Sequence, residues 1–538
     1  MNTDVLRVYK SIHTWTGILA GLALFIAFYA GALTIFKEPI SQWASAPGPG
    51  VEAVPLKDVN AVIAYALETE PKAAKDLRVH LIPSESLPGR VSFEVPGEGA
   101  DDHNQLAYRH FIATVEADGK PIVQEAHPTQ VAELIDVLHR VVGLPFDTDE
   151  NRWIMGVVAL LYAVALVSGL IIFLPNMMKN FFALRQNKGP RRKWLDAHNV
   201  VGIFSLPFHL VIVFTSVVFA YHDGLYGIQN QLIHDGNLRA YFAADRPKVA
   251  NHSPVDPKNL LPPETLAAKA VELSPTFKPT MLQYVRANSP QAMVRVWGND
   301  DTAVAPRAWG GFVILNPYTG EVLTQEYLPN KQSAASTTLS SFFALHFATY
   351  GGTAVQWIYF FLGLAGAWLF YSGNLLWIEN RRKVARLNHA QPIQRRDTYW
   401  MASATVGVCV GAVAGISAAI VASKWLHGFG ESLTVWHQSV YYGVFFASIF
   451  WAFFRGGAKA SVELLLLAAI LTLAIPFTSL LAWLVPSSGL WVYLDSAALG
   501  VDLTALAGGG ALLWMAKSAY RRAYCGTADS VWSANAVA

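Results

Sequence analysis

Charged side chains are scarce in this chain of 538 residues: 14% are Asp, Glu, Lys or Arg, against about a quarter in an ordinary soluble domain. Together with 53% hydrophobic residues and a mean hydropathy of +0.32, this scarcity excludes a soluble globular protein. Disorder is excluded as well, because so apolar a chain could not stay solvated. The 40 basic and 38 acidic residues nearly cancel, so the net charge of +2 gives no overall bias toward nucleic acid.

Cysteine is nearly absent. Cys409 and Cys525, the two in the chain, fall in or beside predicted membrane helices. A disulfide framework, a CxxC zinc site and a CxxCH haem attachment are therefore excluded. The sequence also shows no catalytic triad, HExxH motif or nucleophile elbow, which argues against a protease and leaves the catalytic residues unknown.

Long apolar runs are plentiful. A bilayer core about 30 Å thick needs roughly 20 apolar residues in a helix. Eight windows of that length occur, at about 13–36, 152–175, 197–221, 354–378, 400–422, 435–454, 461–485 and 490–516. Asp495 and Asp502 interrupt the last window, so either that span begins near Gly500 or the two acids serve proton movement or a quinol site. An even number of spans predicts both termini on one side of the membrane.

Basic residues indicate the orientation, because Lys and Arg in short loops stay cytoplasmic. The loops 176–195 and 379–397 contain six basic residues each. We therefore expect cytoplasmic termini in a bacterial inner membrane, with segments 37–151 and 222–353 on the periplasmic side. The sequence Ala44-Ser45-Ala46 resembles a signal-peptidase site, but the apolar run before it is too long for a signal peptide and favours an uncleaved anchor.

The two outer segments repeat each other. Residues 111–125 (FIATVEADGKPIVQE) and 312–326 (FVILNPYTGEVLTQE) share Phe, Gly, Gln and Glu in register, and each is typical of a β-hairpin. Helix-like stretches (Lys57–Glu70, Pro263–Leu273) and strand-like stretches (Arg90–Val95, Met293–Val296) precede them. The pattern predicts two small α+β domains.

The repeat continues into the membrane. His13 and His198 each begin a His-x-x-x-Gly motif at the start of a span, and His139 and His346 each follow a Leu shortly before the next span. Parallel repeats of this kind are related by an axis along the membrane normal, so each pair of histidines would come face to face. Paired neutral imidazoles are good axial ligands for haem iron, and Gly17 and Gly202 would let a flat macrocycle approach the helices.

His209 is a further candidate without a counterpart in the first span. It lies eleven residues after His198, about 16.5 Å along a helix. It is either a ligand, paired with His346 or His437, or a polar residue near the outer haem. His427 and His437 are interpreted as solvated or hydrogen-bonded, and no metal-ligand spacing connects the others: His80, His103, His110, His127, His222, His234, His252 and His389.

The combination of motifs over residues 1–385 resembles the PepSY-associated transmembrane family. It is carried by His13/Gly17, Leu138-His139-Arg140, Asp196/His198/Gly202 and Leu345-His346/Gly351-Gly352. The resemblance implies an inner-membrane, haem-containing reductase that releases iron from ferric siderophores. It implies two b-type haems, one between His13 and His198 and one between His139 and His346; His209 would bring in a third.

We therefore expect an all-α membrane bundle of about eight helices with two PepSY-like periplasmic domains and an internal duplication. The expected parts are 1–36, 37–151, 152–221, 222–353 and 354–378, then an added four-helix module, 398–517, and a cytoplasmic tail, 518–538. Electrons from a quinol or cytoplasmic donor would reach a periplasmic ferric-siderophore or other Fe(III) chelate. The alternatives are a non-catalytic PepSY membrane protein that binds a peptide or partner and modulates proteolysis, and a transporter.

Overall fold

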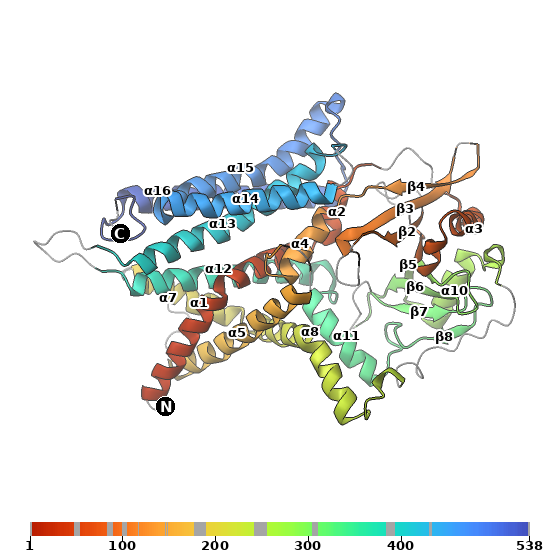
Figure 1. Cartoon of the computed structure of the whole chain (residues 1–538), viewed down its shortest axis with the longest axis horizontal. Helices are drawn as coiled ribbons and strands as arrows, with labels where there is room; N and C mark the ends of the chain where they lie inside the picture. The colour runs from red at the N-terminus through yellow and green to blue at the C-terminus, as the bar shows by residue number, and fades with distance from the viewer. Residues whose placement is uncertain are drawn as a thin grey trace, which may run out of the picture. The chain divides into compact units, whose positions relative to one another are not determined.

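The computed structural model describes residues 3–47, 54–82, 90–98, 100, 105–116, 118–145, 147, 149–176, 190–240, 255–303, 310–383, 393–429 and 433–535. Its contacts divide the chain into two compact units, each described here by itself. The helical unit comprises Met1–Ser45, Thr129–Ala220 and Ile358–Ala538, and the sheet unit comprises Ala46–Pro128 and Tyr221–Trp357 (Figure 1).

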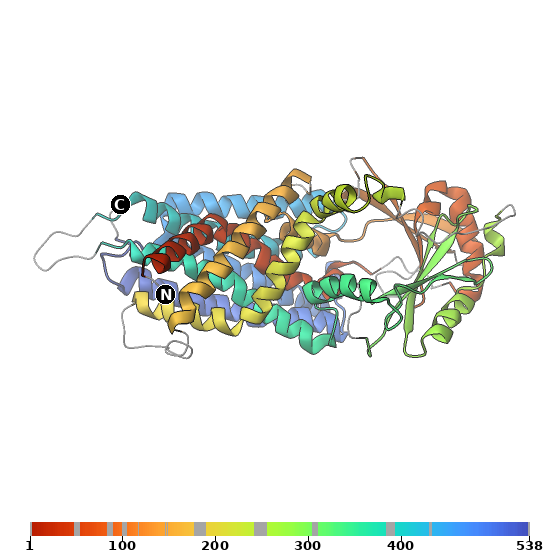
Figure 2. The same cartoon turned by 90° about the horizontal axis from the view of Figure 1, so that it is seen from below.

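Seven described helices are long and apolar enough to cross a membrane. They include parts of α1 (Thr3–Thr34), α5 (Asp149–Phe173), α8 (Leu206–Leu232), α12 (Gly352–Asn380), α13 (Arg396–Trp425), α15 (Gly457–Leu484) and α16 (Ser496–Cys525). Each matches an apolar window of the sequence. The ends of the described chain lie at the same end of the helical unit (Figure 2).

The eighth expected span, 435–454, is a helix but is not one of these seven. It forms α14 (Leu433–Arg455). Its N-terminal half contains Trp436, His437, Gln438, Tyr441 and Tyr442, whose polar atoms lower its hydropathy. It nevertheless packs closely along α13, where Gly407, Gly411 and Gly415 leave room for it, as small residues do between membrane helices.

The third expected span, 197–221, is divided. A helix α7 (Pro190–Phe204) ends at Ser205, and α8 begins at Leu206. Pro207 cannot donate a backbone hydrogen bond to the preceding turn, which explains the break. His198 therefore lies on α7, and His209 lies in the first turn of α8.

Two short helices complete the described part of the helical unit. The helix α2 (Lys37–Ala44) follows α1, and α4 (Val131–Arg140) precedes α5. The apolar side of α4 is buried, with Val131, Leu134, Ile135 and Leu138 at most 2% exposed. These residues recur at three- and four-residue intervals and therefore lie on one side of the helix.

The sheet unit contains eight antiparallel strands in the order β4-β3-β2-β1-β5-β6-β7-β8. Their bounds are β1 (Leu77–His80), β2 (Val91–Pro96), β3 (Tyr108–Val115), β4 (Pro121–Ala126), β5 (Lys278–Val285), β6 (Met293–Asn299), β7 (Phe312–Leu315) and β8 (Val322–Thr324). The predicted hairpins are confirmed: Phe111 pairs with Glu125, and Leu315 with Val322.

Helices α3 (Val59–Thr69) and α10 (Pro263–Leu273) cover one face of this sheet (Figure 2). Val62, Ile63 and Leu266 from these helices pack on Val79, Phe93, Leu282 and Val296 from the strands in a single core. The sequence indicates two separate small domains, whereas β1 pairs with β5 and joins both halves in one sheet. A pairing between strands about 200 residues apart has no local signal.

Candidate functional site

His13 and His198 lie side by side in the helical unit. Their ring centres are 6.4 Å apart, and the ring planes are inclined at 75°. Metal–imidazole nitrogen bonds are about 2 Å long, so two rings on opposite sides of one iron have their centres roughly 6 Å apart. The separation therefore fits a pair of axial ligands.

Hydrogen bonds fix the tautomers of both rings. Nδ1 of His13 donates to the carbonyl oxygen of Ala165 on α5, at 2.8 Å. Nδ1 of His198 lies 2.9 Å from Oγ of Ser372 on α12, and that hydroxyl donates its own proton to the Leu369 carbonyl. Both Nδ1 atoms therefore carry the proton, and each Nε2 keeps the lone pair that binds a metal.

His139 has the same arrangement beside the C-terminal half of α1. Its Nδ1 donates to the Ala27 carbonyl at 2.8 Å, so its lone pair is on Nε2. Its proposed partner, His346, lies in the last turn of α11 (Ala334–Phe347), in the sheet unit. Because the two units are described separately, the pairing of His139 with His346 stays a prediction.

Glycines make room for two of these rings. A Cβ atom at Gly169 would lie 2.9 Å from Cε1 of His13, and one at Gly31 would lie 2.8 Å from Nδ1 of His139. Sequence reasoning missed both, although a glycine inside an apolar span is a signal of close approach. Gly17, which the sequence pattern singled out, has open space in front of it among the described residues.

His209 differs from the other three. It is 2% exposed, its Nδ1 lies 2.6 Å from the Tyr162 hydroxyl, and Nε2 has no hydrogen-bond partner among the described residues. A tyrosine hydroxyl can donate or accept, so both tautomers of His209 remain compatible with this contact. Rings of Phe28 and Phe208 lie 5.6 and 5.5 Å from it.

The last four helices contain polar groups that the sequence only partly indicated. Asp495 caps α16 by accepting from the backbone N–H groups of Ala497 and Ala498, and Asp502 accepts from Trp43 and Ser479. Both acids therefore have structural contacts. His437, expected to be solvated or hydrogen-bonded, is fully buried, and neither ring nitrogen has a hydrogen-bond partner in the described part of the chain.

Lys424 on α13 was missed altogether. It is 2% exposed; its ammonium group donates to the Trp491 carbonyl at 2.9 Å and lies 3.8 Å from the centre of the Trp43 ring. A buried lysine in an apolar span needs such partners. These contacts attach α2 to the last four helices.

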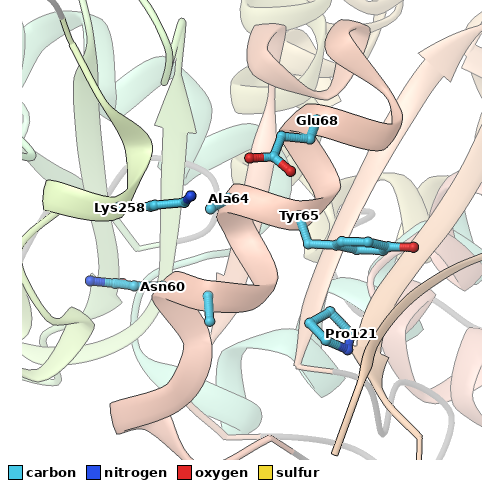
Figure 3. A pocket seen from close by; sticks show the side chains of 7 residues that line it. Asn60, Ala64, Tyr65, Glu68, Pro121 and Lys258 are labelled. Atoms are coloured by element: carbon cyan, nitrogen blue, oxygen red, sulfur yellow. The ribbon is translucent and has the colours of Figure 1, made fainter.

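A pocket of about 370 Å³ lies beside α3 in the sheet unit. Tyr65 and Glu68 of α3, Pro121 and Lys258 line it, with Lys258 across from α3 (Figure 3). None of the candidate histidines belongs to it. Among the described residues, no three His, Cys, Asp or Glu side chains gather where they could hold a metal ion.

The remaining histidines of the outer segments have local roles where they are described. His80 contacts the Ser92 hydroxyl at 3.1 Å, and His110 lies 3.5 Å from Glu94. His103, His252 and His389 lie outside the described residues, as does most of the basic loop 176–195.

Fold and site together define a multi-pass membrane protein with a separate antiparallel sheet. The chain belongs to the family of the PepSY-associated TM region, whose model matches residues 10–380. A search of curated proteins finds no match. The matched region contains all five candidate ligands and ends before α13, so the last four helices lie beyond it.

Proposed function

We propose that this protein carries electrons across the bacterial inner membrane through two b-type haems and reduces periplasmic Fe(III), held as a ferric siderophore or a similar chelate. The observation that carries the proposal is the His13–His198 pair. Its rings lie 6.4 Å apart, and hydrogen bonds at both Nδ1 atoms leave the lone pairs on Nε2.

The chain's own residues would hold and tune such a group. His13 and His198 would hold a haem on the cytoplasmic side, and that haem would supply one-electron transfer. The Ala165 carbonyl and the Ser372 hydroxyl orient the imidazoles and raise their basicity, as outer partners of metal ligands do. The surrounding apolar helices keep water away.

His139 and His346 would hold the second haem on the outer side. The bond from His139 to Ala27 supports this, because it reproduces the arrangement at His13 on another helix. The order of the sheet, with three strands on each side of the central β1–β5 pair, supports an internal duplication and two PepSY-like halves. Both termini lie at the same end of the helical unit, which supports the expectation that they are on the same side of the membrane (Figure 2).

Reduction would release the metal from its chelate. Hard oxygen ligands bind Fe(II) less tightly than Fe(III), so one electron delivered to a ferric siderophore weakens its hold on iron. The donor would be a quinol or a cytoplasmic reductant.

Replacement of the ligands tests the proposal. We expect the purified protein to show a reducible, low-spin b-type haem spectrum, and His13→Ala and His198→Ala each to remove the same part of it. His222→Ala, at an exposed histidine on α8, should leave the spectrum unchanged. If the complete spectrum survived in the double variant His13→Ala/His198→Ala, this ligand pair would be wrong.

The same measurement separates the alternatives. A non-catalytic PepSY protein or a transporter requires no haem, so a protein purified without one would favour either of them. Uptake into proteoliposomes would then distinguish these two.

A further inference from the structure

Six charged side chains form a connected network around the helix that carries His139. They are Lys37 of α2, Glu133, Asp136 and Arg140 of α4, Asp147 of the following turn, and Arg152 of α5. All six belong to the helical unit. Three are positive and three negative, so the network is neutral as a whole.

Each link of the network is short. Lys37 Nζ lies 2.5 Å from Glu133 and 3.3 Å from Asp136. Arg140 lies 3.2 Å from Glu133, 3.4 Å from Asp136 and 2.8 Å from Asp147. Arg152 is the last member of the network and lies 2.9 Å from Asp147, whose side chain is 1% exposed.

The charges are partly removed from water. The side chains of Glu133, Asp136 and Arg140 are 18%, 22% and 25% exposed, and such pairs are screened much less than surface pairs. Burial opposes the charged form of Asp136, but Lys37 and Arg140 outweigh it and hold the pKa of this carboxyl below its ordinary value. The network is therefore charged at neutral pH.

The ion pairs of the network link α4 to α2 and α5. The hydrogen bond from His139 to Ala27 links α4 to α1. Asp136 lies one helical turn before His139, and Arg140 follows it directly. With only ten residues, α4 cannot fix a side chain by its own stability, because isolated helices of that length are marginal in water. The ion pairs supply the rigidity that an axial ligand needs.

We infer that this network positions His139 and sets the reduction potential of the haem that His139 binds. The inference rests on the proposed function. Carboxylates near a haem stabilise its ferric form, and ammonium or guanidinium groups destabilise it. Because charges of both signs surround one helix, removing them one at a time should move the potential in opposite directions.

The test uses the full-length protein and two nearly isosteric changes. Glu133→Gln removes a negative charge and should raise the midpoint potential of the haem wave that is lost in His139→Ala. Lys37→Met removes a positive charge and should lower it. Each change should alter the ratio of reduced to oxidised haem at a fixed potential by about tenfold, which equals about 59 mV.

Two controls separate electrostatics from folding. Asp118→Asn and Lys120→Met make the same charge changes in an exposed turn of the sheet unit and should move no potential. The double variant Lys37→Met/Glu133→Gln restores neutrality and should return close to the wild-type potential with a low-spin spectrum. If both single variants lose the haem, the double variant decides between the explanations. A double variant that retains this haem supports the inference, and one that loses it contradicts the inference.

Shifts in the same direction, or no shift in haem-loaded protein, would overturn the inference while leaving the proposed function intact. A wild-type protein without haem would instead contradict the proposed function. The two failures are therefore distinguishable in one set of titrations.

Discussion

The proton on each Nδ1 decides what His13, His139 and His198 can bind. A backbone carbonyl accepts and never donates, so the bonds to Ala165 and Ala27 fix the proton on Nδ1 and the lone pair on Nε2. At His198 a serine hydroxyl has the same role, since it already donates to Leu369. Three separate helices thus present imidazoles in the tautomer that suits a metal.

Ser372→Ala tests this at a single residue. Loss of the hydroxyl leaves the Nδ1–H of His198 without its acceptor, and such changes around metal ligands typically cost 10–100-fold in affinity. We expect weaker haem retention at the His13/His198 site during apo-protein titration. Ser461→Ala, which removes a buried hydroxyl that donates to the Ala458 carbonyl within α15, is the matched control, and equal retention in both variants would contradict the role of Ser372.

At the same scale, the sequence predicted that His13 and His198 lie close together, but not which groups hold their rings. The His-x-x-x-Gly repeat is visible along the chain, and it placed His13 and His198 together. Ala165 and Ser372 are 152 and 174 residues from the rings that they contact, and an alanine carbonyl has no sequence signature. Lys37 and Glu133 are 96 residues apart, so their contact has no local signal in the sequence either.

Among the elements, strand β1 of the sheet unit contains a half-buried histidine, His80, close to two arginines. Burial, followed by the nearby charges of Arg78 and Arg90, lowers the pKa of His80 on β1 from 6.5 to about 4. The folded sheet therefore favours the neutral ring. Its contribution to stability is complete above pH 6.5 and is lost as the pH falls from 6.5 toward 4.

His80→Gln should remove part of this acid sensitivity. We expect hydrogen exchange in β1 and β2 of the full-length protein to accelerate between pH 7 and pH 4.5, after correction for intrinsic rates, and to do so less in the variant. His222→Gln in the same unit should behave as the wild type. An equal acceleration in all three proteins would show that His80 is not responsible.

Elements were predictable where their signals are local. The windows of apolar residues located seven spans, and the alternation around a glycine turn located both hairpins. The division of the third span at Pro207 and the β1–β5 pair were not predicted. The division depends on the backbone N–H that Pro207 lacks. The β1–β5 pair depends on a strand register between segments that are distant in sequence.

At the scale of the whole molecule, the proposed conduit needs two sites at different depths of one bundle. On α1, His13 and Ala27, which accepts the bond from His139, are fourteen residues apart, about 21 Å along the helix. That is a large part of a hydrocarbon core about 30 Å thick. This spacing is what the proposed function requires of two sites on opposite sides of the membrane.

The number of haems per chain tests this account most directly. A pyridine haemochrome assay on the purified, full-length protein, referred to its molar concentration, should give two b-type haems per chain. A third would add His209 to the ligands. A well-folded protein without haem would contradict the account.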